Sequence, residues 1–298
     1  MIVNYPPFFQ GKSYFVQFLF LMIFVIGGAS IFSAFGLLFG QFLGFDSLAS
    51  LRCTQFFSSL GAFFVPALLF SYCTERKFFS YNLGNRKPQC TNMLLVIVMA
   101  IFIIPIVSLL GYWNNLITMP EFMSGIEQWM KEMEEANNAI IEKLTLDPRI
   151  SILFINIVVM ALLPAIGEEF LFRGTIQSFC NKIFKNDHVA IWITAIIFSA
   201  IHLQFYGFVP RMLLGAYLGY LFYWSRSIWV PVVAHFLHNA LSLILDFIGN
   251  SKGWNLESPF EIQGGAVLIG VSVVVVTSGI YALWKIFREK KMLRCKIF

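Results

Sequence analysis

Long apolar stretches dominate this sequence and limit it to one class of fold. Eight of them approach or exceed the roughly 20 residues that a helix needs to cross a bilayer. Their limits are 14–42, 54–73, 93–112, 151–180, 188–204, 208–225, 227–248 and 264–287. Only 12% of the residues are charged, against roughly 25% in a soluble domain. The sequence therefore predicts an all-α, polytopic membrane bundle of about eight transmembrane helices.

Basic residues gather in the loops that an eight-helix arrangement places on one side of the membrane. They follow the second, fourth and last apolar stretches: Arg76, Lys77, Arg86, Lys87, Lys182, Lys185, Arg288, Lys290, Lys291, Arg294 and Lys296. The loop 113–149, on the opposite side, is rich in acidic residues. Because basic loops remain in the cytoplasm, both termini are predicted to be cytoplasmic. The net charge of +5 is spread over these loops, which argues against nucleic acid as a partner.

The stretch 120–147 is predicted to form an amphipathic helix. Its apolar residues recur at helical spacing on one stripe, and its acidic residues lie elsewhere. Such a helix lies on the outer membrane surface or packs on the bundle. One interpretation is a lid that guides substrate, and the other is a docked connector.

Two carboxylates and an arginine interrupt the fourth apolar stretch. Ionisable groups inside a bilayer cost at least a few kcal/mol each, so Glu168, Glu169 and Arg173 indicate function. On an α-helix, Glu169 and Arg173 are four residues apart with the acid first, which favours an ion pair. Glu168 is rotated by about 100° and need not join that pair. It is therefore the carboxylate predicted to act as a general base on water.

Two further polar pairs lie in the fifth and seventh apolar stretches. Phe198 and His202 are four residues apart, and so are His235 and Asn239. Counting about 1.5 Å per residue along the helices places both histidines near the depth of Glu168. The three segments are therefore predicted to meet. There, an imidazole and an amide can stabilise an oxyanion, or imidazoles and carboxylates can hold a metal.

A proline precedes each of two candidate site residues by four positions. Pro164 comes before Glu168, and Pro231 comes before His235. Because proline removes a backbone donor, both helices are predicted to kink at this point.

Three motifs thus occur in order, each on a separate predicted helix: Glu168-Glu169-x-x-x-Arg173, Phe198-x-x-x-His202 and His235-x-x-x-Asn239. This ordered set resembles the CAAX protease and bacteriocin-processing family (CPBP, also called Abi) of intramembrane proteases, which includes the Ras-converting enzyme. The resemblance covers about residues 150–245. Each motif alone is weak, and the ordered set is specific.

The resemblance implies an eight-helix endopeptidase that cuts a membrane-associated protein or peptide in a cavity inside the membrane. Glu168 would activate water with help from His202, while His235 and Asn239 would stabilise the oxyanion. The neighbouring ion pair of Glu169 would order the site.

A metal and two other functions remain open. The family is often labelled metallopeptidase, which implies a divalent metal such as zinc at Glu168, His202 and His235; a metal-independent glutamate mechanism is the alternative. The sequence lacks the H-E-x-x-H motif of a helix-borne zinc site. A non-catalytic bacteriocin-immunity protein or peptide-binding membrane scaffold is a second function. A proton-coupled transporter is a third, weakened by the absence of an inverted repeat.

The chain divides into three predicted parts. Residues 1–149 hold three transmembrane helices and the amphipathic segment 120–147. Residues 150–248 form the catalytic core that the resemblance implies, and residues 249–298 hold the last helix and a basic cytoplasmic tail. The partners would be membrane lipid and a peptide or protein substrate. The predicted location is a prokaryotic cytoplasmic membrane.

Overall fold

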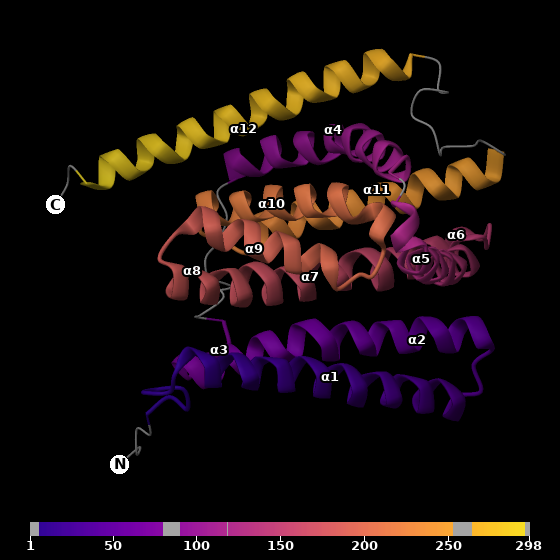
Figure 1. Ribbon diagram of the computed structural model, residues 1–298, viewed down its shortest axis with the longest axis horizontal. Coiled ribbons are helices and arrows are strands. Elements are labelled where there is room, and N and C mark those ends of the chain that lie inside the picture. The colour runs from indigo at the N-terminus through magenta and orange to yellow at the C-terminus, as the bar shows by residue number, and fades with distance from the viewer. Residues whose placement is uncertain (1–5, 80–89, 118, 253–263, 296–298) are drawn as a thin grey trace.

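A computed structural model describes residues 6–79, 90–117, 119–252 and 264–295 of the chain. Every regular element among them is helical, and most helices run side by side along one direction (Figure 1). On one side lie α1 (Tyr14–Phe42), α2 (Ser47–Ser59) and α3 (Val65–Glu75), and on the other lies α12 (Gly265–Cys295). Between them lie α4 (Cys90–Asn115), α6 (Ile150–Asn156), α7 (Leu163–Glu169), α8 (Ser178–Phe184), α9 (Asp187–Ala200), α10 (Phe208–Ser225) and α11 (Trp229–Lys252).

The all-α polytopic bundle is confirmed. Six helical segments among the described residues are long and apolar enough to cross a membrane: Tyr14–Phe42, Ser47–Glu75, Met93–Asn115, Ile150–Phe184, Trp229–Lys252 and Gly265–Ile286. The other two predicted crossings are also helices, α9 and α10, but α9 has only 14 residues and α10 is less apolar. The number eight and the cytoplasmic side therefore stay predictions. The described chain begins and ends at the same end of the bundle (Figure 1).

The fourth apolar stretch is not one continuous α-helix. It contains two π-helical segments, η3 (Ile157–Leu162) between α6 and α7, and η4 (Phe170–Gln177) between α7 and α8. A similar segment, η1 (Leu60–Phe64), joins α2 to α3. Single π turns inside α-helices are found most often at functional sites. Here η4 begins directly after Glu169 and carries Arg173.

The two prolines behave differently. Pro164 is the second residue of α7, which follows the π-helical segment η3, so the kink predicted there stays a prediction. Pro231 is the third residue of α11, so the predicted kink beneath His235 is wrong. Amides in the first turn of a helix have no intrahelical partner, and a proline there removes nothing that the helix uses.

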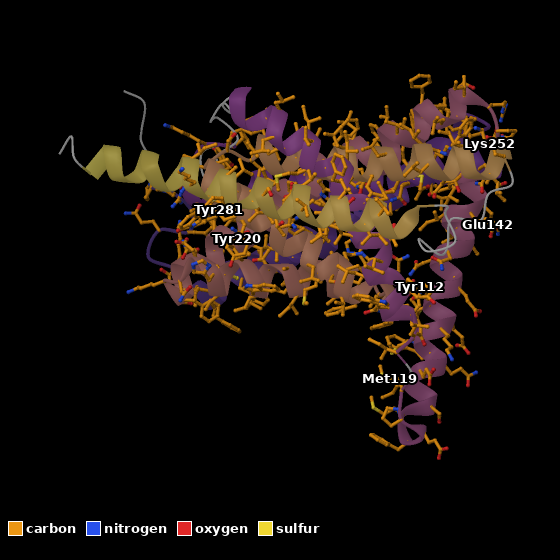
Figure 2. The ribbon with its side chains drawn as sticks, turned by 90° about the horizontal axis from the view of Figure 1, so that it is seen from above. Tyr112, Met119, Glu142, Tyr220, Lys252 and Tyr281 are labelled. Carbon is orange, nitrogen blue, oxygen red and sulfur yellow. The ribbon has the colours of Figure 1, made fainter. Side chains whose placement is uncertain are left out.

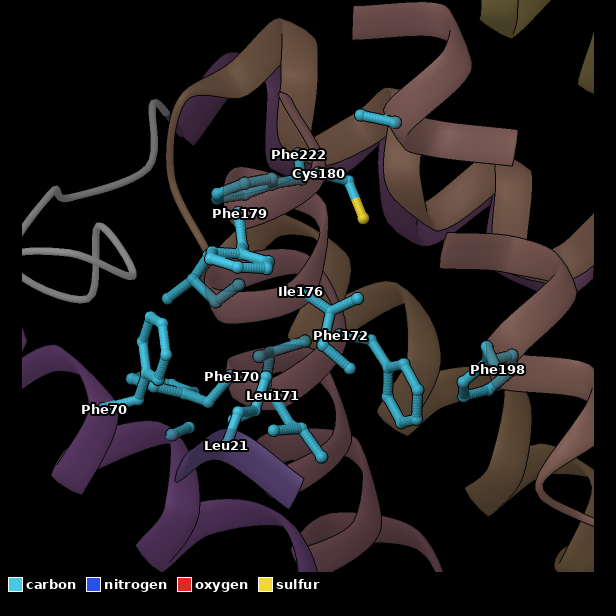
Figure 3. Close-up of a cluster of buried hydrophobic side chains, with 14 of the residues drawn as sticks. Leu21, Phe70, Phe170, Leu171, Phe172, Ile176, Phe179, Cys180, Phe198 and Phe222 are labelled. Carbon is cyan, nitrogen blue, oxygen red and sulfur yellow. The ribbon is translucent and has the colours of Figure 1, made fainter. Parts of the chain in front are cut away.

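Aromatic side chains fill the core around η4 (Figure 3). Phe170 and Phe172 are buried and pack against Phe64 and Phe198 with ring centroids 5.5 and 5.1 Å apart. Phe70 and Phe179 extend this cluster toward the ends of α3 and α8. The cluster fixes η4 between α3 on one side and α9 on the other.

The predicted amphipathic segment 120–147 forms η2 (Glu121–Met123) and α5 (Ser124–Thr145). Unlike the other helices, α5 projects sideways from the bundle (Figure 2). Near its middle, the Trp129 ring lies 5.2 Å from that of Phe205, and Glu134 Oε2 accepts a hydrogen bond from the Tyr206 amide. The element is docked against the turn between α9 and α10, as a connector would be.

The C-terminal end of α5 is also held. The buried Arg52 on α2 donates through Nη2 to the Leu144 carbonyl at 3.0 Å and through Nε to Asn156 Oδ1 at 3.0 Å. Asn156 on α6 donates to the same carbonyl at 2.7 Å. These bonds satisfy a carbonyl in the last turn of α5, which has no partner within the helix.

Candidate active site

The ion pair predicted from spacing is present at the centre of the bundle. Arg173 Nη1 lies 2.6 Å from Glu169 Oε1, and both side chains are 0% exposed. The guanidinium also donates to the Gly215 carbonyl of α10 at 3.0 Å and lies 4.6 Å from the centre of the Phe198 ring. A buried charge needs such a set of partners to remain ionised.

His235 connects this pair to the second carboxylate. Its Nδ1 donates to Glu169 Oε1 at 2.7 Å, and its Nε2 lies 3.9 Å from Glu168 Oε2. Because a carboxylate only accepts hydrogen bonds, the Glu169 contact places a proton on Nδ1 and turns Nε2 toward Glu168. The distance to Glu168 is too long for a direct hydrogen bond and suits a bridging water.

Glu168 is buried, yet it accepts no hydrogen bond from any residue in the described part of the chain. The two adjacent carboxylates therefore differ, as their rotation around the helix predicts. Glu169 is occupied by Arg173 and His235, whereas Glu168 is free to take a proton.

His202 lies beside this network, just after the end of α9. Its Nδ1 donates to the Phe198 carbonyl at 2.7 Å, which leaves Nε2 as an acceptor when the ring is neutral. The Phe198 ring lies between the two histidines, with its centroid 5.0 Å from that of His202 and 6.0 Å from that of His235. Leu203, the next residue, has a φ of 52°, so the chain turns away shortly after α9 has ended at Ala200.

Asn239 lies one turn after His235 on α11 and is half-buried. It makes no hydrogen bond to the residues that the structure describes. The structure thus joins Glu169, Arg173 and His235 by direct bonds, sets Glu168 3.9 Å from His235, and places His202 near them across the Phe198 ring. Asn239 is assigned to the site only because it lies one turn after His235 on α11.

Arg211 on α10 was missed by the sequence interpretation. Its Nη2 donates to Gln204 Oε1 at 2.6 Å and its Nη1 to the Gln204 carbonyl at 3.3 Å. Gln204 lies two residues after His202, so these bonds hold the guanidinium at the turn that carries His202. The signal was present in the sequence, because an arginine inside the apolar stretch 208–225 is as unusual as the pair in the fourth stretch.

The residues predicted to bind metal do not form a metal site as they are placed. Among the described residues, no group of three or more His, Cys, Asp or Glu side chains lies close enough together to hold an ion. Of the three predicted ligands, Glu168 and His235 are within 3.9 Å of each other. Zinc at Glu168, His202 and His235 therefore stays a prediction of the resemblance.

The motifs, now seen to meet in space, can be compared with known proteins. Residues 150–241 match the Rce1-like family. Its description is type II CAAX prenyl endopeptidase, Rce1-like, and the matching region contains all three motifs. The resemblance to CAAX-type proteases is confirmed for this part of the chain. Together with its apolar helices, the Rce1-like region makes this a multi-pass membrane protein.

A curated bacterial protein is similar to part of this chain. The chain is 30% identical over 90 residues to the uncharacterized protein YpbD of Bacillus subtilis (strain 168). The similarity covers 29% of this chain and 43% of YpbD, so it spans less than half of that relative. No solved structure matches the chain significantly.

Proposed function

We propose that this protein is an intramembrane endopeptidase that hydrolyses a peptide bond of a membrane-associated protein or peptide. The observation that carries the proposal is the free, buried carboxylate of Glu168 facing His235 Nε2 across 3.9 Å. A general base must reach the proton that it removes directly or through one water. A water held between these two atoms would be polarised from both sides.

In the proposed reaction, the oxygen of this water attacks the scissile carbonyl carbon and its proton passes to Glu168. The carbonyl oxygen becomes an oxyanion. Glu168 then returns the proton to the nitrogen of the leaving peptide as the carbon–nitrogen bond breaks. The products are a carboxylic acid and an amine, and Glu168 is again ionised; the new carboxylic acid then gives its proton to water or to the amine.

Four further side chains would assist. His202 Nε2 is an acceptor in the neutral ring and would support the base. The Asn239 amide and the Arg211 guanidinium would donate to the oxyanion, where preorganised donors act most strongly in a site that excludes water. His235 would become a third donor whenever its Nε2 carries a proton.

Glu169 and Arg173 are positioning residues in this proposal. Glu169 accepts the hydrogen bond from His235 Nδ1, which fixes the orientation of the ring, and Arg173 pairs with Glu169. The ion pair thereby holds Nε2 toward Glu168.

A divalent metal such as zinc stays a separate proposal, and none of these steps passes through it. It is tested by metal analysis of the purified protein and by activity after chelation. We further propose a prokaryotic cytoplasmic membrane as the location, and peptide maturation or bacteriocin self-immunity as the role, rather than the cutting of prenylated tails.

The direct test compares purified wild-type protein with Glu168→Gln in cleavage of a membrane-embedded reporter peptide. Glutamine keeps the size of the side chain but cannot take a proton, so the rate should fall by roughly 10²–10⁴-fold. Glu132→Gln, an exposed change on α5, is the matched control and should cleave at the wild-type rate. Cleavage by Glu168→Gln protein at the wild-type rate would refute the proposal.

A further inference from the structure

The turn between α9 and α10 carries or binds two side chains that the proposed reaction uses. It spans residues 201–207 and ends in the short helix η5 (Phe205–Gly207). His202 lies in this turn, and Arg211 of α10 donates to both the carbonyl and the side chain of Gln204. The places of the imidazole and of the guanidinium therefore depend on how firmly the turn is held.

The backbone of this turn contains a conformation that its sequence does not favour. Leu203 has a φ of 52°, in the left-handed region that disfavours residues with a Cβ. Such residues persist only where the surrounding structure holds them in place, and they are concentrated at functional sites. The turn therefore needs partners from other elements.

Asn114 near the end of α4 is a buried partner of this kind. Its side chain is on a residue that is only 7% exposed, and its Nδ2 donates to the Phe205 carbonyl at 3.1 Å and to the Tyr206 carbonyl. The amide nitrogen carries two hydrogens, so one side chain can serve both carbonyls. The bonds join residues 91 and 92 positions apart in the sequence.

The other side chains that bind the turn contact different backbone atoms. Glu134 of α5 accepts a hydrogen bond from the Tyr206 amide at 3.3 Å, and Ser199 of α9 donates to the Phe208 carbonyl at 2.7 Å. Neither contacts the two carbonyls that Asn114 binds. Asn114 thus ties the turn to α4, a helix that supplies no side chain to the proposed reaction.

The course of α4 brings Asn114 to this turn. In Figure 1, the second half of α4 leaves the direction that most helices share. Pro105 lies inside this helix, and a proline in a helix interior kinks it. The last turn of α4 thereby reaches the α9–α10 turn from the side.

We propose that Asn114 is a positioning residue of the active site. It does not touch the reacting atoms, and it acts by fixing the turn that carries His202 and binds Arg211. This inference rests on the proposed endopeptidase function. Catalysis is sensitive to such support, because a displacement of about 1 Å caused by a distant change can lower a rate by about 10²-fold.

The test measures reporter cleavage by the purified full-length Asn114→Leu variant. Leucine keeps the approximate size of the side chain and removes both donors. We expect kcat to fall by roughly 10- to 100-fold. KM should stay nearly unchanged, because the turn supports groups that act in the transition state. Asn115→Leu is the matched control, since Asn115 is the exposed neighbour on the same helix, and it should cleave at the wild-type rate.

A double variant separates positioning from simple stabilisation of the fold. If Asn114 acts through the turn, Asn114→Leu/Arg211→Gln should lose less kcat than the product of the two single losses. The reason is that the first change already displaces the guanidinium that the second removes. Losses that multiply would overturn the inference, and so would a wild-type kcat in Asn114→Leu.

Amide hydrogen exchange at residues 201–207 gives a measurement that does not need activity. Exchange there should be faster in Asn114→Leu and unchanged in Asn115→Leu. Unchanged exchange in Asn114→Leu would overturn the inference whatever the activity. If the wild-type protein cleaves no reporter, the proposed function fails, and the exchange still decides whether Asn114 holds the turn.

Discussion

His235 is the residue on which the proposed chemistry depends most, because its two nitrogens face two different carboxylates. Nδ1 is bonded to Glu169 at 2.7 Å, and Nε2 lies 3.9 Å from Glu168. Glu169 in turn is paired with Arg173. The orientation of one imidazole thus depends on a charge pair that is fully buried.

Removing one partner of this pair should be severely destabilising. Arg173→Met leaves the Glu169 carboxylate buried without its cation, which costs about 3–5 kcal/mol. The double variant Glu169→Gln/Arg173→Met removes both charges and should recover part of that loss. Thermal unfolding in detergent measures both effects. A double variant as unstable as the sum of the two single variants would show that the charges are not coupled.

Arg211 should contribute to the rate rather than to the fold. It is half-buried and held only by Gln204 among the described residues, so Arg211→Gln should leave the melting temperature nearly unchanged. Loss of one donor to an oxyanion costs roughly 10²–10³-fold in kcat. Reporter cleavage at saturating substrate measures it, with Lys131→Gln on α5 as control. An unchanged kcat would remove Arg211 from the site.

The sequence predicts the Glu169–Arg173 pair because both residues lie on one helical segment with a fixed spacing. It does not predict the bond from His235 to Glu169, which joins residues 66 positions apart. That contact depends on how α7 and α11 pack, and periodicity carries no information about it. Arg211 was within reach of sequence reasoning, because a charge in an apolar stretch is visible without coordinates.

At the scale of elements, α5 is held at two points while it projects from the bundle (Figure 2). Trp129 and Glu134 contact the turn between α9 and α10, next to His202 and Gln204. Arg52 and Asn156 hold the other end. Because α5 is attached close to His202, a displacement of α5 would also move this side of the site, even though α5 is docked as a connector.

Arg52→Met should release the C-terminal end of α5. The change removes two hydrogen bonds from a buried guanidinium. We expect faster amide hydrogen exchange in residues 136–147 and a lower melting temperature. Arg149→Met is the matched control, since the Arg149 side chain is 70% exposed and surface ion pairs such as its pair with Asp147 contribute little to stability. Equal effects of both changes would contradict the anchoring role.

A substitution at the end of α8 should increase thermal stability rather than decrease it. Lys185 caps this helix with a φ of 52°, a conformation that costs a residue with a Cβ about 1 kcal/mol relative to glycine. Lys185→Gly should therefore raise thermal stability slightly. Lys182→Gly, inside the same helix, should lower it by a similar amount. A lower melting temperature for Lys185→Gly would contradict this account of the cap.

The sequence predicts which stretches are helical, but it does not predict the π-helical turns inside them. Each apolar stretch contains a helix, because backbone groups in lipid must bond within the segment, although the fifth stretch, predicted to reach residue 204, is helical only to Ala200. The π segments η3 and η4 have no signature in residue type, since the same residues suit an α-helix. They arise from packing and from the proline that follows η3.

At the scale of the whole molecule, the basic loops and the chain ends share one end of the bundle. Arg76 and Lys77 follow α3, and Lys182 and Lys185 end α8 at that same end (Figure 1). The acidic α5 lies toward the opposite end. The folded bundle therefore has a charge polarity, with basic residues at one end and the acidic helix α5 toward the other.

This polarity predicts the orientation in the membrane. With the native cysteines replaced, Lys185→Cys should react with a membrane-impermeant thiol reagent only from the cytoplasmic side. Glu132→Cys on α5 should react only from the other side. Labelling of right-side-out and inverted vesicles measures both. Labelling of the two positions from the same side would refute the predicted topology.

The π-helical segment η4 makes the count of residues after Glu169 as important as their identity. A π turn holds one residue more than an α turn, so deleting one residue from Phe170–Gln177 would let this stretch close into a regular α-helix while α8 keeps its face toward the bundle. Inserting one residue instead would turn α8 by about 100° relative to the two glutamates. The site should therefore tolerate a single-codon deletion between Gly174 and Gln177 better than a single-codon insertion at the same place.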